Sequence, residues 1–368
     1  MKVLILGGYG NFGRRIAQLL TRQDIAVIVA GRDSAKAAEL AASLPSGLAE
    51  PAMFDVTSEL PRQLERLRPG VVINTCGPFQ NTGYDVARAC IAAAVHYIDL
   101  ADGRDFVAGI TQLDADAKNR NLAVISGAST VPALSSAVIE RFLPRFRSIK
   151  SLIYGISPGQ KTERGLATTQ AILGYVGRRL KPCAGYQTRY GWQDSYVQAY
   201  PGLGKRWMSN CDIPDLDLLP AKYGIEAIRF SAGMEVPLIH VGLWLLSWGV
   251  RLKLPIDLPA HARMLLKASN WFDWLGSADG GMHVIVEGED FSGQRAIAKW
   301  FIIARSGDGP YIPAVPPVVL VKQIVAGKPP APGARPCVGL IGLQDYLDEL
   351  NGFDIETYEF NTCEFGEH

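Results

Sequence analysis

The feature that most constrains this chain is a glycine-rich turn directly after a short apolar run. The run Val3–Leu6 leads into GGYGNFGRR, in which Gly8, Gly10 and Gly13 have the G-x-G-x-x-G spacing. In dinucleotide-binding folds this spacing follows a strand and opens a helix. Gly8 then allows a tight turn, Gly10 lets backbone approach a pyrophosphate, and Gly13 lets helix and strand pack closely. The stretch predicts a nucleotide cradle. The alternative is a structural turn that holds no nucleotide.

The helix predicted after this turn opens with Asn11 and Phe12. The first amides of a helix have no partner within it, and the helix dipole is positive at that end. Both effects favour a bound phosphate. We therefore expect Asn11 and Phe12 to join the three glycines in cofactor binding.

Strand-like and helix-like segments alternate through the first third of the chain. Short connections between such segments predict a parallel sheet covered on both faces, and the right-handed crossover rule makes it doubly wound. The expected strands are Val3–Leu6, Ala26–Ala30, Ala52–Asp55, Val71–Cys76, Tyr97–Leu100 and Ala123–Ser126. Helical patterns include Phe106–Asn119 and, after the last strand, Ser129–Phe142. This α/β Rossmann domain is expected to span residues 1–146.

A second region begins near residue 147, and its sequence pattern differs from the strand–helix alternation of the first. Met282–Glu289 and Arg295–Arg305 alternate in character and flank a turn, which predicts a hairpin in a mixed or antiparallel sheet. We assign residues 147–308 to a second α+β domain. The acidic tail after Gln344 is expected to pack loosely.

The end of the second strand indicates which nucleotide is bound. An NAD site places an acidic residue there to bind the ribose hydroxyls. This chain reads Ala30-Gly31-Arg32-Asp33. Gly31 leaves room for a 2′-phosphate and Arg32 supplies a planar cation to bind it. Asp33 is one place too late and is expected to cap the next helix. The pattern favours NADP(H) over NAD(H).

Further cofactor residues are expected where the third and fourth strands end, because those ends face the ligand crevice in this fold. Asp55 is placed either to meet the adenine edge or to cap a helix. After the fourth strand, Cys76-Gly77-Pro78-Phe79 combines a close backbone approach at Gly77 with a stiff turn at Pro78. Phe79 is expected to lie under the ribose or nicotinamide. Cys76 has no histidine close in sequence to activate it, so we assign it to cofactor binding.

Two carboxylates follow the fifth strand in HYIDLAD, Asp99 and Asp102. A polar side chain at this edge could orient the substrate or move a proton, so both are the candidate catalytic residues. The alternative for each is a turn or capping role.

This ordered set of features resembles the saccharopine dehydrogenase-like oxidoreductases. The resemblance rests on the glycine turn, Arg32, CGPFQ and ARACIAAAVHYIDLADG, and it extends to about Ser135. It implies nicotinamide chemistry and a second domain that contacts substrate and often forms a homodimer. It also implies that a C-terminal helix, at about 309–345, returns to complete the first domain. The loop after the sixth strand lacks the acidic residue of saccharopine-forming members, so we expect a different substrate.

Composition limits the partners. Lys and Arg total 37 and Asp and Glu total 36, which leaves no basic field for nucleic acid. Six scattered cysteines without a C-x-x-C pair favour reduced thiols and a cytoplasmic location, and no histidine spacing predicts a metal site. Val236–Val250 is apolar but shorter than the roughly 20 residues that span a bilayer. A buried or interfacial helix is expected there, with peripheral membrane contact as the alternative.

These features together predict an NADP(H)-dependent oxidoreductase. Hydride would pass between the nicotinamide and a carbonyl, imine or enoyl group of a small-molecule substrate. Aromatic residues in the second region favour a bulky or apolar substrate, although core packing also explains them. Two alternatives remain: an NADP-binding sensor without turnover, and a peripheral-membrane reductase that modifies lipids.

Overall fold

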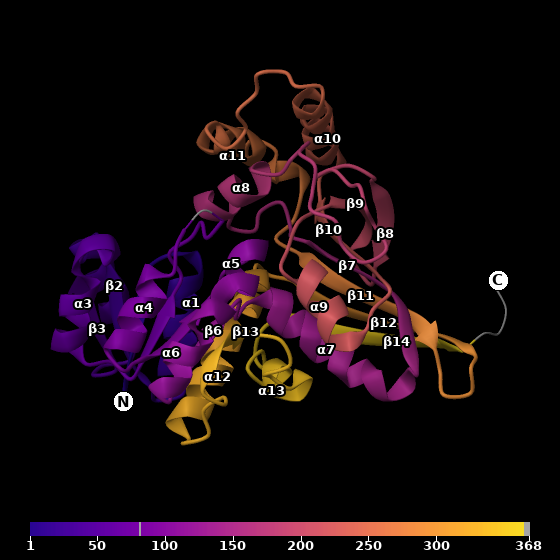
Figure 1. The fold of residues 1–368 in the computed structure, drawn as a ribbon. Helices are drawn as coiled ribbons and strands as arrows, with labels where there is room; N and C mark the ends of the chain where they lie inside the picture. The colour runs from indigo at the N-terminus through magenta and orange to yellow at the C-terminus, as the bar shows by residue number, and fades with distance from the viewer. Residues whose placement is uncertain (81, 364–368) are drawn as a thin grey trace. The chain divides into compact units, whose positions relative to one another are not determined.

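The computed structural model of the chain describes residues 1–80 and 82–363. Two compact units divide the chain, and each is formed from two separate stretches. Unit 1 contains Met1–Ala137 and Pro310–Leu350. Unit 2 contains Val138–Gly309 and the stretch that begins at Asn351. Figure 1 shows the helices and strands of both units.

Unit 1 is built on a seven-stranded parallel sheet, in the order β13-β6-β5-β4-β1-β2-β3. The apolar runs form its centre because helices cover both faces, so residues such as Leu4, Ile28 and Val72 are fully buried. This arrangement confirms the predicted doubly wound α/β fold. Its strands are β1 (Lys2–Leu6), β2 (Ala26–Gly31), β3 (Ala49–Met53), β4 (Val71–Asn74), β5 (His96–Asp99), β6 (Ala123–Ser126) and β13 (Gly333–Pro336).

Two expected helices of unit 1 differ from the prediction. The segment expected as Phe106–Asn119 breaks into two α-helices with a 3₁₀ turn between them, and the helix expected from Ser129 begins at Ser135 because Val131 has an extended backbone. The α-helices that lie wholly or partly in unit 1 are α1 (Asn11–Thr21), α2 (Ser34–Ser43), α3 (Val56–Leu67), α4 (Asp85–Ala92), α5 (Arg104–Gly109), α6 (Asp114–Asn119), α7 (Ser135–Phe142), α12 (Val315–Val325) and α13 (Leu343–Asp348).

The returning stretch Pro310–Leu350 adds both a strand and helices to unit 1. β13 pairs in parallel with β6 and becomes the last strand of the sheet. Beside α1, the Arg15 guanidinium lies 5.4 Å from the centre of the Tyr311 ring. The Tyr311 hydroxyl donates a hydrogen bond to Gln18 Oε1 at 2.9 Å. The helix that carries the glycine turn is therefore braced by residues about 300 positions away in sequence.

Unit 2 contains a second seven-stranded sheet, in the order β14-β12-β11-β7-β10-β9-β8. β7 and β10 are parallel and the other neighbours are antiparallel, which confirms the predicted mixed sheet and the β11–β12 hairpin. The prediction of a loosely packed tail was wrong for Ile355–Cys363, because β14 pairs with β12 from Ala296 to Ala304. Residues 364–368 of the tail lie outside the described residues. The strands are β7 (Ser148–Ser157), β8 (Tyr196–Tyr200), β9 (Gly204–Asn210), β10 (Ala227–Met234), β11 (Gly280–Glu289), β12 (Arg295–Ala304) and β14 (Ile355–Cys363).

Helices α8 (Leu166–Leu173), α10 (Pro237–Arg251) and α11 (Ala262–Asn270) lie together at one end of the unit 2 sheet, away from β12 and β14 (Figure 1). They share a small apolar cluster that includes Leu173, Trp192 and Leu258. The unit also contains an ion pair between buried Arg206 and half-buried Glu235, with 3.2 Å between Arg206 Nη1 and Glu235 Oε1. The helices of the unit are α8 (Leu166–Leu173), α9 (Asp215–Tyr223), α10 (Pro237–Arg251) and α11 (Ala262–Asn270).

Across the described residues, every helix is either too short or too polar to cross a membrane. The five cysteines whose side chains are described are all free thiols. They are Cys76, Cys90, Cys183, Cys211 and Cys337.

Candidate cofactor-binding site

The predicted site residues gather at one edge of the unit 1 sheet. Because all seven strands are parallel, their carboxyl ends lie along a single edge. The chain winds outward in opposite directions from β1 and β4, and ligands bind at such a switch point. There the Thr75 hydroxyl donates to the Leu6 carbonyl oxygen at 2.8 Å and lies 3.2 Å from that of Gly7. The glycine turn and the loop after β4 are thereby joined.

The glycine turn is tight, and close contacts exclude side chains from it. The Gly10 amide donates to the Gly7 carbonyl at 2.8 Å, and Gly7 has a φ of +71°. Gly7 therefore supplies the left-handed residue of the turn, a role that the sequence analysis gave to Gly8. A Cβ on Gly8 would lie 2.9 Å from Val29 Cγ1, and one on Gly13 would lie 2.8 Å from Gly8 Cα. Both glycines are required by close packing of this turn.

The start of α1 offers amide groups at the same edge. Gly10 is the N-cap residue and has no side chain to cap the helix. The amides of Phe12 and Gly13 find no acceptor among the described residues. Arg15 donates to the Asn11 carbonyl oxygen at 2.6 Å and also to Asn11 Oδ1, which fixes the first turn. This end of the helix can bind an anion through backbone donors.

Tyr9, which the sequence analysis did not select, covers the end of β2. Its ring lies against Gly31, where an added Cβ would be 2.6 Å from Tyr9 Cζ. The Tyr9 hydroxyl accepts a hydrogen bond from the Asp33 amide at 3.0 Å. Gly31 therefore makes room for Tyr9 in this structure, whereas the sequence analysis assigned that room to a phosphate. The contact joins residues 22 positions apart, and no periodic pattern encodes it.

Arg32 is exposed at the end of β2, beside the capped start of α2. Asp33 caps that helix by accepting from the amides of Ala35 and Lys36 at 3.1 and 3.2 Å, as predicted. The positive charge of Arg32 is a minor contribution to the lowered pKa of Asp55 and opposes the rise in the pKa of Cys76, which places Arg32 within electrostatic range of both. An exposed guanidinium in this position is available to an anionic ligand.

Asp55 serves as the N-cap of α3. Its Oδ1 accepts from the Thr57 amide at 2.8 Å and from the Thr57 hydroxyl at 2.6 Å. In return, Glu59 Oε2 accepts a hydrogen bond from the Asp55 amide at 2.8 Å. The Thr57 side chain is the largest cause of the lowered pKa of Asp55, followed by the Thr57 amide. Of the two roles left open for Asp55, this geometry supports the capping role, and contact with adenine stays a prediction.

Cys76 is an exposed residue in the loop after β4. Its amide donates to Asn74 Oδ1 at 3.0 Å, and Asn74 Nδ2 donates to the Tyr97 hydroxyl at 3.2 Å. Protein packed around the thiol raises its pKa to about 11, although Arg32 opposes this shift. A thiol of such high pKa is protonated near neutrality and is a poor nucleophile.

The next three residues of this loop, Gly77 to Phe79, differ in their exposure to solvent. Gly77 and Pro78 are exposed and joined by a cis peptide bond. Phe79 is buried, with its ring centre 5.3 Å from that of Phe106. The Phe79 ring therefore packs into the core and supports the loop, and its contact with the cofactor stays a prediction.

Asp99 is fully buried between the ends of β5 and β6. Its Oδ1 accepts from the Ala101 amide, the Ser126 hydroxyl and the Gly127 amide, each at 2.9 Å. Burial raises the pKa of this carboxyl to about 6 despite these donors. Asp99 holds the two loops together and has no exposed atom for a substrate, so a direct catalytic role does not fit this geometry.

Asp102 is half-buried and lies next to the loop after β4. Gln80 Nε2 donates to Asp102 Oδ1 at 3.0 Å. Burial is the largest influence on this carboxyl and raises its pKa, while the Gln80 hydrogen bond acts in the opposite direction. Of the two predicted catalytic carboxylates, Asp102 is the one with access to solvent. Gln80 was not selected from the sequence, although it follows Phe79 directly.

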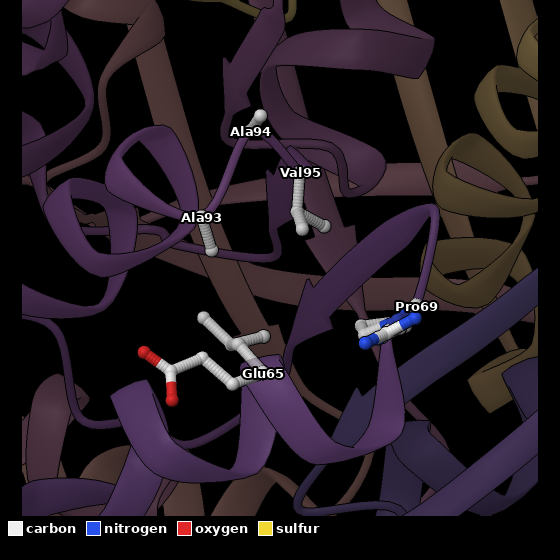
Figure 2. Close-up of a pocket in the computed structure, with 7 residues that line it drawn as sticks. Glu65, Pro69, Ala93, Ala94 and Val95 are labelled. Carbon is white, nitrogen blue, oxygen red and sulfur yellow. The ribbon is translucent and has the colours of Figure 1, made fainter.

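The hollow shown in Figure 2 lies at the opposite edge of the sheet. Its walls come from the ends of α3 and α4 and from the residues that precede β4 and β5. They are Leu64, Glu65, Arg68, Pro69, Ala93, Ala94 and Val95. Since these residues adjoin the amino ends of the strands, the hollow is separate from the glycine turn and contains none of the predicted site residues.

Comparison with known proteins agrees with this geometry. Residues 3–128 match the family described as the saccharopine dehydrogenase NADP binding domain. The fold resembles that of apo saccharopine dehydrogenase (L-Glu forming) from Saccharomyces cerevisiae, with 15% identity and a TM-score of 0.65, over 98% of this chain and 99% of that chain. Amine dehydrogenase from Mycobacterium smegmatis shows 12% identity and a TM-score of 0.49, over 92% and 95% of the chains. No curated protein matches the chain.

Proposed function

Because residues 3–128 match the saccharopine dehydrogenase NADP binding domain family, we propose that the protein is an NAD(P)-dependent oxidoreductase. In this proposal it transfers hydride between NADP(H) and a carbonyl, imine or enoyl substrate. The glycine turn between β1 and α1, at the switch point of the sheet, is the observation that carries the proposal. NADP(H), when bound, supplies the hydride chemistry, and the protein supplies binding, orientation and proton handling.

The residues at the edge fit this cofactor. A Cβ on Gly10 would lie 3.0 Å from the Gly7 carbonyl oxygen, so the turn is free of side chains where a pyrophosphate must approach. The Phe12 and Gly13 amides and the positive end of α1 would bind the pyrophosphate. Arg32, exposed at the end of β2, would bind the 2′-phosphate. Tyr9, whose hydroxyl is fixed by the Asp33 amide, would border the same phosphate.

The nicotinamide end is assigned to the loop that follows β4. Gly77 and Pro78 expose backbone there, and Asp102 adjoins this loop through Gln80. Burial raises the pKa of the Asp102 carboxyl, which is the direction that favours a proton on this group. We therefore assign proton handling to Asp102 and a positioning role to Asp99, which holds the neighbouring loops.

The decisive experiment measures NADPH and NADH binding to the wild-type protein and to Arg32→Ala. Charge-assisted hydrogen bonds contribute about 1.5–3 kcal/mol, so NADPH should bind roughly 10- to 100-fold more weakly to the variant. NADH affinity should change little because NADH lacks the 2′-phosphate. Arg120→Ala is the matched control, since Arg120 is also exposed but caps α6 at the other edge of the sheet. Equal loss of both cofactors, or no loss, would contradict the role of Arg32.

A second candidate function is an NADP-binding sensor without turnover. The full burial of Asp99 favours it, because one of the two predicted catalytic carboxylates is withdrawn from the site. Steady NADPH oxidation with any member of a carbonyl, imine and enoyl panel would exclude the sensor. Loss of that turnover in Asp102→Asn, with NADPH affinity retained, would support Asp102 as the proton-handling residue.

A further inference from the structure

Helix α10 of unit 2 presents one apolar face to solvent, while other apolar residues of the helix pack inside the unit. Its two fully buried residues are polar, His240 and Ser247, and both make hydrogen bonds inside the unit. Its exposed large residues recur at intervals of three and four, which places them along one face of a helix. They are Leu238, Val241, Leu245, Trp248 and, at the C-cap, Leu252. A solvated helix normally has the reverse arrangement, so this face is built to be covered.

More apolar side chains are exposed in the chain segment that follows α11. Trp271 and Trp274 are 80% and 76% exposed, the highest values among the tryptophans in the part of the chain that the structure describes. Glu235, two residues before the start of α10, accepts a hydrogen bond from the Ser277 amide at 2.8 Å. This hydrogen bond holds the tryptophan segment beside the start of α10. We call the α10 face together with Leu254, Trp271 and Trp274 the apolar cap surface. Figure 1 shows α10 and α11 at one end of the unit 2 sheet.

The charges around this surface select its partner. Between residues 235 and 274 the chain has four Lys or Arg residues and three acidic residues, Glu235, Asp257 and Asp273. Two of these acids are already in ion pairs, Glu235 with Arg206 and Asp273 with Arg164. Lys253, Arg263 and Lys267 are exposed and have no ion-pair partner among the described residues. A second copy of the chain would bring Lys253, Arg263 and Lys267 together with their own like charges, with Asp257 as the acid outside these ion pairs. Anionic lipid headgroups would neutralise these cations, and each Lys or Arg near such a surface contributes about fivefold to binding.

We propose that the apolar cap surface docks the protein on an anionic phospholipid bilayer. Leucine and tryptophan side chains enter the boundary between headgroups and acyl chains, while the lysines and arginine contact phosphate groups. The contact is peripheral, because α10 has 15 residues and a bilayer-spanning helix needs about 20. Trp244 takes no part, since it packs against the apolar cluster beneath the helix.

The test is co-sedimentation of the full chain with vesicles of phosphatidylcholine alone or mixed with phosphatidylglycerol. Binding should be strong with the mixture, weak with phosphatidylcholine, and reduced by salt. Trp271→Ser/Trp274→Ser should lower the partition coefficient roughly tenfold or more. Lys253→Glu/Arg263→Glu/Lys267→Glu should lower it by about 100-fold or more. Phe291→Ser, a change at an exposed residue in the β11–β12 turn, should have no effect.

Three results would overturn the proposal. The first is absence of wild-type binding to the anionic vesicles. The second is binding that the double tryptophan variant retains at full strength. The third is a homodimer in vesicle-free solution that dissociates in Leu245→Ser/Leu252→Ser, as seen by sedimentation velocity, because the surface would then belong to a second copy. Unchanged melting temperatures in the variants would show that they are folded.

Discussion

The contact between Tyr9 and Gly31 provides the sharpest test of how the end of β2 is arranged. A methyl group on Gly31 would lie 2.6 Å from Tyr9 Cζ and 2.7 Å from its hydroxyl oxygen, and it would overlap Cε1. The backbone at Gly31 does not have a positive φ, so alanine is excluded there by Tyr9 alone. Gly31→Ala should therefore displace the ring and break its hydrogen bond with the Asp33 amide.

The expected magnitude has two parts. Overpacking costs about 1–3 kcal/mol, and the lost hydrogen bond adds about 1 kcal/mol. In a Tyr9→Ala background neither part applies. The same Gly31→Ala change should then be neutral or should stabilise the protein by about 0.4–1 kcal/mol, because alanine restricts the unfolded chain. The double-mutant cycle thus predicts a change of sign.

The assay is urea unfolding followed by circular dichroism, using the transition that NADPH shifts to higher urea concentration, since the cofactor stabilises the unit that binds it. Gly83→Ala is the matched control, because its added methyl group would lie 3.8 Å from the nearest described atom, an ordinary contact. An equal cost for Gly31→Ala with and without Tyr9 would refute the reasoning, because the cost would then come from the backbone at residue 31.

Two further predictions concern titratable groups at the same edge of the sheet. Burial raises the pKa of Asp99 from 3.8 to about 6, so the folded state binds its proton more tightly than the unfolded state. The contribution of Asp99 to the free energy of unfolding is therefore present below about pH 4 and falls by about 3 kcal/mol as pH rises through 6. Urea unfolding of Asp99→Asn at a series of pH values should lack this fall. The same dependence of unfolding free energy on pH in both proteins would contradict the assignment. With a pKa of about 11, Cys76 should react with iodoacetamide at pH 7 roughly 100-fold more slowly than a free thiol. Mass spectrometry of the Cys76 peptide should show further protection by NADPH, and rapid labelling at pH 7 would contradict the prediction.

The parts of unit 1 that follow from sequence are those encoded by local patterns. Apolar runs of strand length, separated by helical periods, are sufficient for a parallel sheet with both faces covered. The spacing of Gly8, Gly10 and Gly13 is sufficient for a strand–turn–helix, since Gly8 and Gly13 lack room for a Cβ and one on Gly10 would be a close contact. Asp33 follows from the preference of aspartate for helix N-caps. Homodimer formation, a cytoplasmic location and the substrate stay predictions.

The positions of individual side chains at the edge required the tertiary structure. Asp99 and Asp102 both follow β5, yet one is enclosed by the β6 loop and the other reaches Gln80. Phe79 turns inward because Phe106 offers it a ring to pack on. The chain near the C-terminus forms β14 because β12 would otherwise have unpaired backbone groups along one edge. The sequence of the tail contains no pattern that indicates this partner strand.

The sequence thus determined the sheet, the glycine turn and the cationic residue at the end of β2, because backbone geometry and periodic burial are local properties. The tertiary structure decided which of the two aspartates is fully enclosed and that Tyr9 covers Gly31. It also decided that α10 buries two polar residues and exposes one of its apolar faces. These features depend on neighbours that are distant in sequence, and such neighbours alone determine whether a side chain is enclosed or free.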